Sequence, residues 1–165
     1  MYDTRIRDKA AKVNHTLVAR GEMIVTAESC TGGLIAGALT DVPGSSDAVF
    51  GGFVTYDNRA KIDMIGVDEA LIERWGAVSE SVARAMADGA RDTADVAVAI
   101  AVTGIAGPGG GTEGKPVGLV YFACSTADGT RTLEKRFGDA GRQNVREMSV
   151  ETALDLALEC LGIVA

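Results

Sequence analysis

The stretch MIVTAESCTGGLIAGALT, residues 23–40, constrains the fold of this chain more than any other part of it. Its first residues form an apolar run typical of a short buried strand, and residues 34–39 are typical of a helix packed on that strand. The first N–H groups of a helix have no partner within the helix and favour negative charge. Gly32 and Gly33 would let a ligand approach this backbone closely. The stretch therefore predicts a junction suited to binding an anion.

Two interpretations of this junction are open from these residues alone. Ser29 lies where its hydroxyl can attack a carbonyl carbon and where the resulting oxyanion can be held. Alternatively, Ser29 or Thr31 simply caps the helix with its side-chain oxygen. The local sequence favours neither chemistry nor capping over the other.

The composition is that of a compact α/β protein. The 165 residues suffice for a full hydrophobic core, and we expect one domain spanning residues 1–165. A hydrophobic fraction of 47% with 21 glycines indicates a folded chain with many tight turns. The net charge of −7 argues against nucleic-acid binding, which needs clustered Lys and Arg. A small phosphorylated ligand needs only a few donors and is not excluded.

Cysteine usage and hydropathy indicate the compartment. Cys30, Cys124 and Cys160 are widely spaced and form neither a disulfide framework nor a zinc pattern, so reduced thiols are expected. No apolar run reaches the about 18 residues of a membrane span, and the first residues lack a signal-peptide core. We therefore expect a cytoplasmic protein without a membrane partner.

The sequence contains one histidine, His15, in a stretch with helical periodicity where it is expected on the helix surface. A Ser-His-Asp triad or a site with several histidine ligands therefore has almost nothing to be built from. No metal and no cofactor are expected. Any general base must be a lysine, a tyrosine or a carboxylate.

Hydrophobic periodicity and turn residues predict alternating strands and helices, followed by a hairpin and a last helix. Strands are expected at residues 23–25, 48–56, 95–102, 118–126 and 130–137, the last two joined by a turn at Asp128-Gly129. Helices are expected at about residues 3–20, 34–39, 58–65, 69–74, 80–90 and 142–161. This order predicts an α/β fold, a three-layer α/β/α sandwich with a mixed, largely parallel sheet of about five strands.

Four polar residues follow predicted strands: Ser29, Tyr56, Lys61 and Thr103. Because ligands bind beyond the carboxyl ends of the strands in such sheets, these residues are expected to share one cleft. A lysine one turn into a helix is usually a solvated surface residue. If Lys61 is buried instead, desolvation can lower its pKa until it is a competent base.

The glycine-rich segment from Thr103 to Pro116 partly matches a nucleotide-binding loop. Residues 109–115 fit GxxxxGK, but Pro116 replaces the magnesium-binding hydroxyl and the next residues alternate like a strand. A nucleotide triphosphatase is therefore not expected. The loop either presents N–H groups to a phosphate or carboxylate or is a plain surface loop. Arg142, at the first turn of the last helix, is either reserved for an anion or simply solvated.

Six segments, in order, resemble the CinA C-terminal domain family: TAESCTGGLIA, PGSS, GFVTYDNRAK, GAVSE, TGIAGPGGGTEGKPVG and GDAGR. They cover nearly the whole chain. Members of this family include stand-alone nicotinamide-nucleotide amidohydrolases. The resemblance implies removal of the carboxamide of nicotinamide mononucleotide, giving nicotinate mononucleotide and ammonia, by a serine amidase that needs no metal. It implies a pyridine mononucleotide as the small-molecule partner.

Carried over by motif, the resemblance implies that Ser29 is the nucleophile, Lys61 its base and Tyr56 an aid to proton transfer. Helix N–H groups near Gly32 and Gly33 would stabilise the oxyanion. Cys30 is the rival nucleophile, because a thiolate at a helix N-terminus is activated. The residues implied to line the site and hold substrate are Cys30, Thr31, Gly32, Gly33, Ser46, Thr103, Gly104 and Arg142.

Other functions stay open from the sequence. A family member that has lost activity could serve as a binding or regulatory module for a nucleotide, and an active one could hydrolyse a different small amide. A homo-oligomer is compatible with a small domain carrying one site.

Overall fold

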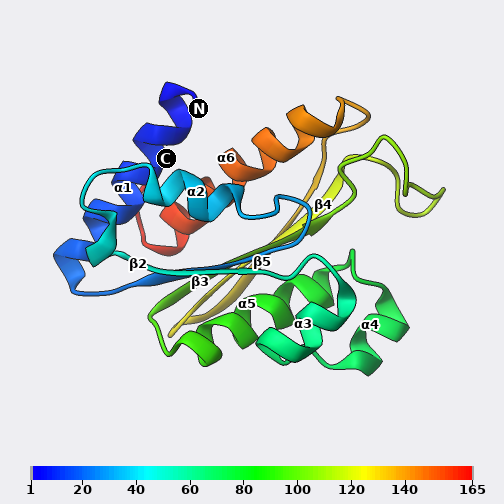
Figure 1. Cartoon of the computed structure of the whole chain (residues 1–165), viewed down its shortest axis with the longest axis horizontal. Coiled ribbons are helices and arrows are strands. Elements are labelled where there is room, and N and C mark those ends of the chain that lie inside the picture. Colours follow the sequence, from blue (N-terminus) through cyan, green and yellow to red (C-terminus); the bar gives the residue numbers. More distant parts are fainter. Residues whose placement is uncertain (1, 165) are drawn as a thin grey trace.

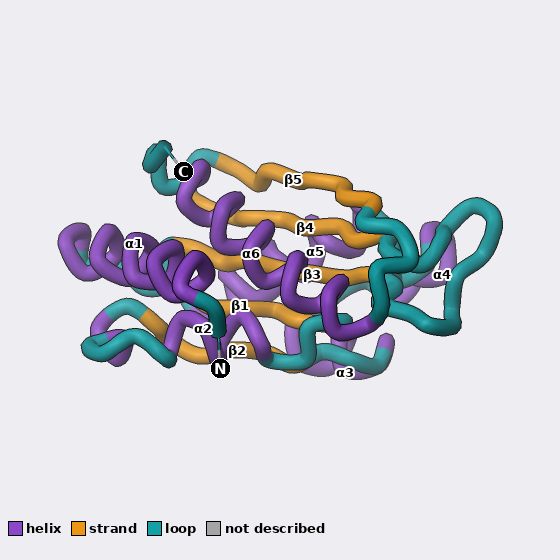
Figure 2. Tube along the Cα trace, turned by 90° about the horizontal axis from the view of Figure 1, so that it is seen from above, coloured by secondary structure: helices purple, strands orange, loops and turns teal. Residues whose placement is uncertain are grey.

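The computed structural model describes residues 2–164, which form one sheet with helices on both faces (Figure 1). The strands are β1 (Ile24–Glu28), β2 (Val49–Val54), β3 (Val98–Gly104), β4 (Leu119–Thr126) and β5 (Gly129–Arg136). Their order is β2-β1-β3-β4-β5, and Figure 2 shows the strands side by side in this order. β1 is parallel to β2 and β3, whereas β4 is antiparallel to both of its neighbours. Four strands thus share one direction, which confirms the mixed α/β sheet.

The helices form a layer on each face of the sheet (Figure 1). One layer contains α1 (Thr4–Arg20), α2 (Leu34–Thr40) and α6 (Arg142–Cys160). The other contains α3 (Asn58–Ile65), α4 (Glu69–Trp75) and α5 (Glu80–Ala94). A short 3-10 helix, η1 (Ser45–Asp47), precedes β2. This arrangement confirms the predicted three-layer sandwich.

Two hydrophobic clusters fill the spaces between the sheet and its two helix layers. The interior strand β1 is fully buried and supplies both clusters by alternation, since successive side chains of a strand point to opposite faces. Ile24 packs in the cluster under α1, α2 and α6, whereas Val25 and Ala27 pack in the cluster with α5. By the same alternation, Glu28 faces the α2 layer and Ser29 faces the α3 layer.

The prediction of a strand beginning at Asp95 is wrong. Helix α5 continues to Ala94, beyond the predicted end near residue 90, and Asp95 caps it in a left-handed conformation with φ 51°. Aspartate tolerates this conformation better than most residues, and its N–H donates to the Arg91 and Asp92 carbonyls. Strand β3 therefore begins only at Val98.

Strand β2 is shorter than predicted, ending at Val54 rather than Tyr56. Thr55 and Tyr56 instead form the connection to α3, whose first turn is capped by the Asp57 side chain. Beyond the glycine-rich segment the chain enters β4 and not a helix, so the P-loop alternative is excluded. The predicted β4–β5 hairpin is confirmed, with its turn at Ala127-Asp128 and Gly129 as the first residue of β5, paired with Thr126.

Candidate active site

Ser29 and Lys61 meet at the carboxyl end of β1. The Lys61 amine, from α3, donates a hydrogen bond to the Ser29 hydroxyl over 3.2 Å. It also donates to the backbone carbonyls of Thr55, at 2.9 Å, and Tyr56, at 3.3 Å. Only 9% of Ser29 and 1% of Lys61 are exposed. The alternative of a solvated surface lysine is therefore wrong.

The environment of Lys61 favours its neutral form. Desolvation by burial is the largest influence and lowers the pKa of the amine, while the nearby Asp57 and Cys30 act in the opposite direction. All three hydrogen-bond partners of the amine are uncharged oxygens, and in the neutral form its two N–H groups suffice for the two carbonyls while its lone pair is left for the Ser29 hydroxyl. A neutral amine in hydrogen-bond reach of a serine hydroxyl can take the proton of that hydroxyl as a general base.

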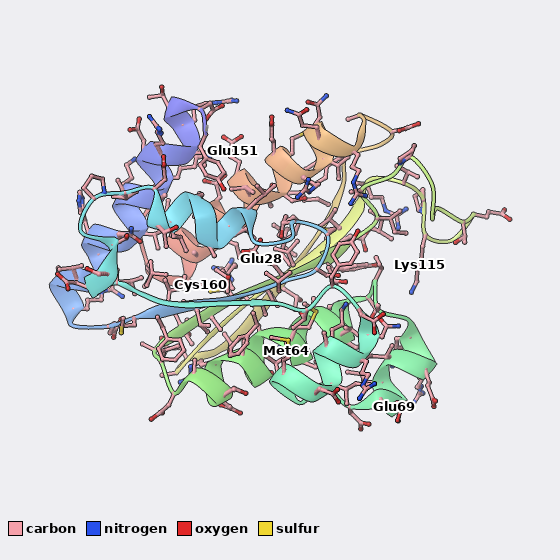
Figure 3. The ribbon with its side chains drawn as sticks, viewed as in Figure 1. Glu28, Met64, Glu69, Lys115, Glu151 and Cys160 are labelled. Atoms are coloured by element: carbon pink, nitrogen blue, oxygen red, sulfur yellow. The ribbon has the colours of Figure 1, made fainter. Side chains whose placement is uncertain are left out.

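The N-terminus of α2 is occupied by a side chain of the protein itself, Glu28. The buried Glu28 carboxylate, labelled beneath α2 in Figure 3, accepts hydrogen bonds from the N–H groups of Gly33, Ile35 and Ala36 at 3.1, 3.0 and 2.8 Å. These donors are therefore not free for an external anion. The N-cap residue Gly33 has no side-chain cap, so capping of α2 by Ser29 or Thr31 is also wrong.

The two glycines of this junction shape the turn instead. Gly32 has φ 60° and Gly33 has φ 101°, both in the left-handed region that favours glycine. The Gly32 N–H donates to the Ser29 carbonyl over 3.1 Å, which closes a turn after Ser29. The expectation that the Gly32 and Gly33 N–H groups hold an oxyanion is therefore wrong, because both donate within the protein.

Two other N–H groups of the loop fit that role better. Within residues 2–164, the N–H groups of Cys30 and Thr31 donate to no oxygen of the protein. In hydrolases with a serine on a strand-to-helix turn, the residue after the nucleophile supplies such a donor. Cys30 and Thr31 are the two residues that follow Ser29, so their backbone, and not their side chains, is suited to contact a developing oxyanion.

The Cys30 side chain is unsuited to nucleophilic attack. It is 5% exposed and packs in the core under α1, α2 and α6. Burial raises the pKa of the thiol to about 12. The α2 N-terminus does not counteract this effect, because the Glu28 carboxylate already occupies it. The side chain of Thr31 is likewise fully buried.

Tyr56 and Arg142 form a second part of the site, above the serine–lysine pair. Tyr56 is 58% exposed, and its hydroxyl accepts a hydrogen bond from the Arg142 guanidinium over 3.0 Å. Arg142 also donates to the Gly107 carbonyl over 3.1 Å, joining the start of α6 to the glycine-rich loop. The hydrogen bond between Tyr56 and the Lys61 amine involves the Tyr56 backbone carbonyl and not its hydroxyl. The structure thus brings the Tyr56 hydroxyl to Arg142 rather than to the predicted proton-transfer position.

Thr103 and Gly104 are the last two residues of the neighbouring strand β3. The Thr103 hydroxyl is buried and donates to the Ala77 carbonyl over 2.8 Å, which leaves its lone pairs as acceptors. By the alternation of β3, Thr103 faces the α5 side, like Ser29. A Cβ added at Gly104 would lie 2.7 Å from a methyl of Val120, so glycine is required there by packing against β4.

Ser46 lies away from the other predicted residues. It belongs to η1, which precedes β2, whereas Ser29 follows β1. Because β1 and β2 are parallel, the start of β2 lies beside the start of β1, at the opposite end of the strands from Ser29. The expectation that Ser46 lines the same site is therefore not met within one chain. The sequence did not show that the start of β2 lies far from the end of β1.

The glycine-rich loop borders the site on the side of α4. Residues 108–114 are exposed, and the Lys115 side chain, which extends from the loop toward α4 in Figure 3, donates to the Trp75 carbonyl. Within the described residues 2–164, no group of three or more His, Cys, Asp or Glu side chains is placed to hold a metal ion. No helix among those residues is both long and apolar enough to cross a membrane.

Sequence reasoning missed two residues of this region, Glu28 and Arg146. The Arg146 guanidinium, from α6, donates to the carbonyls of Cys30, at 3.2 Å, and Thr31, at 3.1 Å. A signal for Arg146 existed, because it lies four residues after Arg142 and therefore on the same face of the helix. For Glu28 the signal was a carboxylate between a buried strand and a helix N-terminus, where negative charge is favoured.

Fold and site together define an α/β sandwich protein with a buried serine–lysine pair at the carboxyl edge of its sheet. Residues 6–161 match the CinA C-terminal domain family. A CinA-like protein of Mycobacterium marinum is 53% identical over 152 residues, covering 88% of this chain and 35% of the relative. One from Synechococcus sp. is 50% identical over 148 residues, covering 89% of this chain and 36% of the relative. The chain thus spans about a third of the length of these relatives.

Solved structures give the same result. A competence/damage-inducible protein from Agrobacterium tumefaciens is 47% identical, with a TM-score of 0.95 and 98% of each chain covered. A CinA superfamily protein from Escherichia coli is 37% identical, with a TM-score of 0.91, covering 97% of this chain and 93% of that one. The chain belongs to the CinA C-terminal domain family.

Proposed function

We propose that this protein is an amidase that hydrolyses nicotinamide mononucleotide to nicotinate mononucleotide and ammonia, with Ser29 as nucleophile and Lys61 as base. The observation that carries the proposal is the hydrogen bond of 3.2 Å between the buried Lys61 amine and the Ser29 hydroxyl. A buried amine with a lowered pKa has few structural uses, whereas strongly perturbed groups cluster at functional sites. Membership of the CinA C-terminal domain family supports the choice of substrate.

The reaction runs in two halves. Neutral Lys61 takes the Ser29 proton while the serine oxygen attacks the carboxamide carbon, giving a tetrahedral oxyanion. The oxyanion collapses, the C–N bond breaks, and the departing nitrogen takes the proton back from the Lys61 ammonium, so that ammonia leaves. A water molecule then attacks the acyl-enzyme with Lys61 again as base. Its addition breaks the ester bond, returns the proton to Ser29 and releases the carboxylic acid.

The backbone of the loop would stabilise the oxyanion. The N–H groups of Cys30 and Thr31 are the free donors that follow the nucleophile. One well-placed donor of this kind is typically worth about 3 kcal/mol of transition-state stabilisation.

The substrate phosphate fits the second part of the site. Arg142 uses two of its guanidinium nitrogens for Gly107 and Tyr56, and a guanidinium has five N–H donors in all. The remaining donors, with N–H groups of the exposed loop at residues 108–114, can bind a phosphate. In this proposal Tyr56 orients Arg142, and Thr103 contacts the substrate through its free lone pairs. No cofactor takes part.

The test is ammonia release from nicotinamide mononucleotide, measured with a chelator present, for wild type, Ser29→Ala and Lys61→Ala. Loss of the base should lower kcat by about 10²- to 10⁴-fold. The exposed Lys12 of α1 supplies a matched control, and Lys12→Ala should retain full turnover. If well-folded wild type binds the mononucleotide but releases no ammonia, the amidase proposal fails for this substrate and a nucleotide-binding module replaces it. If wild type instead hydrolyses another amide, only the proposed substrate is wrong, and the proposed roles of Ser29 and Lys61 remain.

A further inference from the structure

Arg146 contacts the loop that carries Ser29 from the face of the sheet opposite Lys61. It belongs to α6, in the layer with α1 and α2, whereas Lys61 belongs to α3 in the other layer (Figure 1). Its guanidinium donates to two successive carbonyls of the loop, those of Cys30 and Thr31. The loop therefore lies between the Arg146 guanidinium, which contacts its backbone, and the Lys61 amine, which contacts the Ser29 hydroxyl.

The contact with the Cys30 carbonyl fixes the orientation of one of the two free donors. The Cys30 carbonyl and the Thr31 N–H belong to the same planar trans peptide, in which C=O and N–H point in opposite directions. Because Arg146 holds the carbonyl toward the α6 layer, the Thr31 N–H points away from that layer, toward the side on which Lys61 lies. This is the side on which an oxyanion on a Ser29 adduct would form.

The second free donor is fixed in a different way. The Cys30 N–H shares a peptide with the Ser29 carbonyl, which accepts from the Gly32 N–H over 3.1 Å inside the loop itself. The loop therefore orients one donor with its own turn, whereas the other depends on a side chain that lies 115 residues further along the chain.

We propose that Arg146 is a positioning residue that holds the Thr31 N–H in place as an oxyanion donor, without touching the substrate. The inference rests on the proposed function in so far as an oxyanion forms only when Ser29 attacks. A guanidinium suits this task, since its rigid fork donates to two carbonyls at once and a lysine ammonium has no such geometry.

The structure also offers a route for chemical rescue. A groove of about 730 Å³ between the start of α1 and α6 is lined in part by Arg146, Gln143 and Leu34, and by neither Ser29 nor Lys61. Removal of the Arg146 side chain would open a space beside the loop that communicates with this groove. Added guanidinium can enter there and donate to the same carbonyls, whereas ammonium cannot bridge both.

The experiment compares Arg146→Ala and Arg146→Lys with wild type by three measurements. These are ammonia release, the rate of Ser29 labelling by a fluorophosphonate, which develops negative charge on a phosphoryl oxygen, and thermal unfolding. Arg146→Ala should lower both kcat and the labelling rate by about 10- to 100-fold and leave KM little changed. The upper value corresponds to complete loss of one oxyanion donor. Guanidinium should restore part of both rates, and ammonium should not. Arg146→Lys, which keeps the charge and most of the volume, should stay slow.

Gln143→Ala is the matched control, because Gln143 lines the same groove and its side chain bonds only to Glu147. Its rates should equal those of wild type with and without guanidinium. Arg146 variants that label Ser29 as fast as wild type, or that no added guanidinium accelerates, would overturn the inference. Wild type that labels at Ser29 but releases no ammonia would instead remove the proposed substrate and leave the positioning role standing.

Discussion

Glu28 and Lys61 make an instructive pair, because both are fully buried ionisable side chains beside Ser29 and they face opposite sides of the sheet. The Glu28 carboxylate accepts three hydrogen bonds from the first N–H groups of α2, where the helix dipole favours a negative charge. The Lys61 amine has three uncharged oxygens as partners, and burial lowers its pKa. The two side chains differ in how their charge is compensated: the Glu28 charge is balanced by the helix N–H groups, whereas none of these three partners balances a charge on Lys61, as its proposed role as a base requires.

The difference follows from the alternation of a single strand. Consecutive residues of β1 point to opposite faces, so Glu28 meets the start of α2 while Ser29 meets α3. The end of one strand therefore places the Glu28 carboxylate against one helix layer and the Ser29 hydroxyl, the proposed nucleophile, against the other.

The largest effect on stability is expected from Glu28→Ala. The change leaves three N–H groups at the start of α2 without their acceptor, that of Ile35 buried and those of Gly33 and Ala36 partly buried, and we expect the free energy of unfolding to fall by about 3 kcal/mol. Urea denaturation measures this change. Glu28→Gln keeps one carbonyl acceptor and should lose less. If Glu28→Ala unfolds at the same urea concentration as wild type but loses activity, the structural role of Glu28 is wrong, and Glu28 acts in the chemistry instead.

Lys61→Met should change the free energy of unfolding in the opposite direction to Glu28→Ala. Because the pKa of Lys61 is lowered from 10.5 in the folded state, the unfolded chain binds more protons at pH values between the folded and unfolded pKa. The free energy of unfolding of wild type should therefore rise with pH in this window, by at most about 1.4 kcal/mol per pH unit. Below the window the cost of burying the ammonium is fully present, so Lys61→Met should be at least as stable as wild type there.

Urea titrations of wild type and Lys61→Met over a series of pH values up to 10.5 test this prediction, and only the difference between the two proteins counts. Wild-type turnover should rise with pH over the same window, as the neutral amine forms. A difference that stays constant with pH would show that burial leaves the amine protonated, and Lys61 would not then be the base.

Much of the fold was predictable, because its signals are local. The Asp128-Gly129 turn and the alternating strands beside it determined the hairpin, and the buried run at residues 98–102 determined a central strand. The start of that strand was not predictable from the same run, because Asp95 takes a left-handed conformation that only the packing of α5 selects.

The site was predictable in its parts and not in its assembly. Position after a strand identified Ser29, Lys61 and Thr103, since the parallel sheet gathers the carboxyl ends of its strands. Which N–H groups remain free depends on where the Glu28 side chain reaches, and the position of Ser46 depends on the direction of β2. Both depend on how the elements are arranged in space, which the order of residues does not show.

The smallest effect is expected from Cys30→Ala, at the buried residue that follows Ser29. The thiol is 5% exposed and burial raises its pKa to about 12, so the variant should retain turnover within a few-fold and lose about 1 kcal/mol of stability through packing. Cys160 is an internal reference, because it is partly exposed and its neighbours Cys124 and Arg131 lower the pKa of its thiol.

Brief alkylation of the folded protein, followed by peptide mapping, should therefore modify Cys160 and spare Cys30. In Cys160→Ala, the same treatment should leave turnover intact. Turnover that disappears in Cys30→Ala and survives in Ser29→Ala would move the nucleophile to the sulfur. Such a result would require the loop to open, because in the closed arrangement the Cys30 side chain packs in the core and Lys61 contacts Ser29.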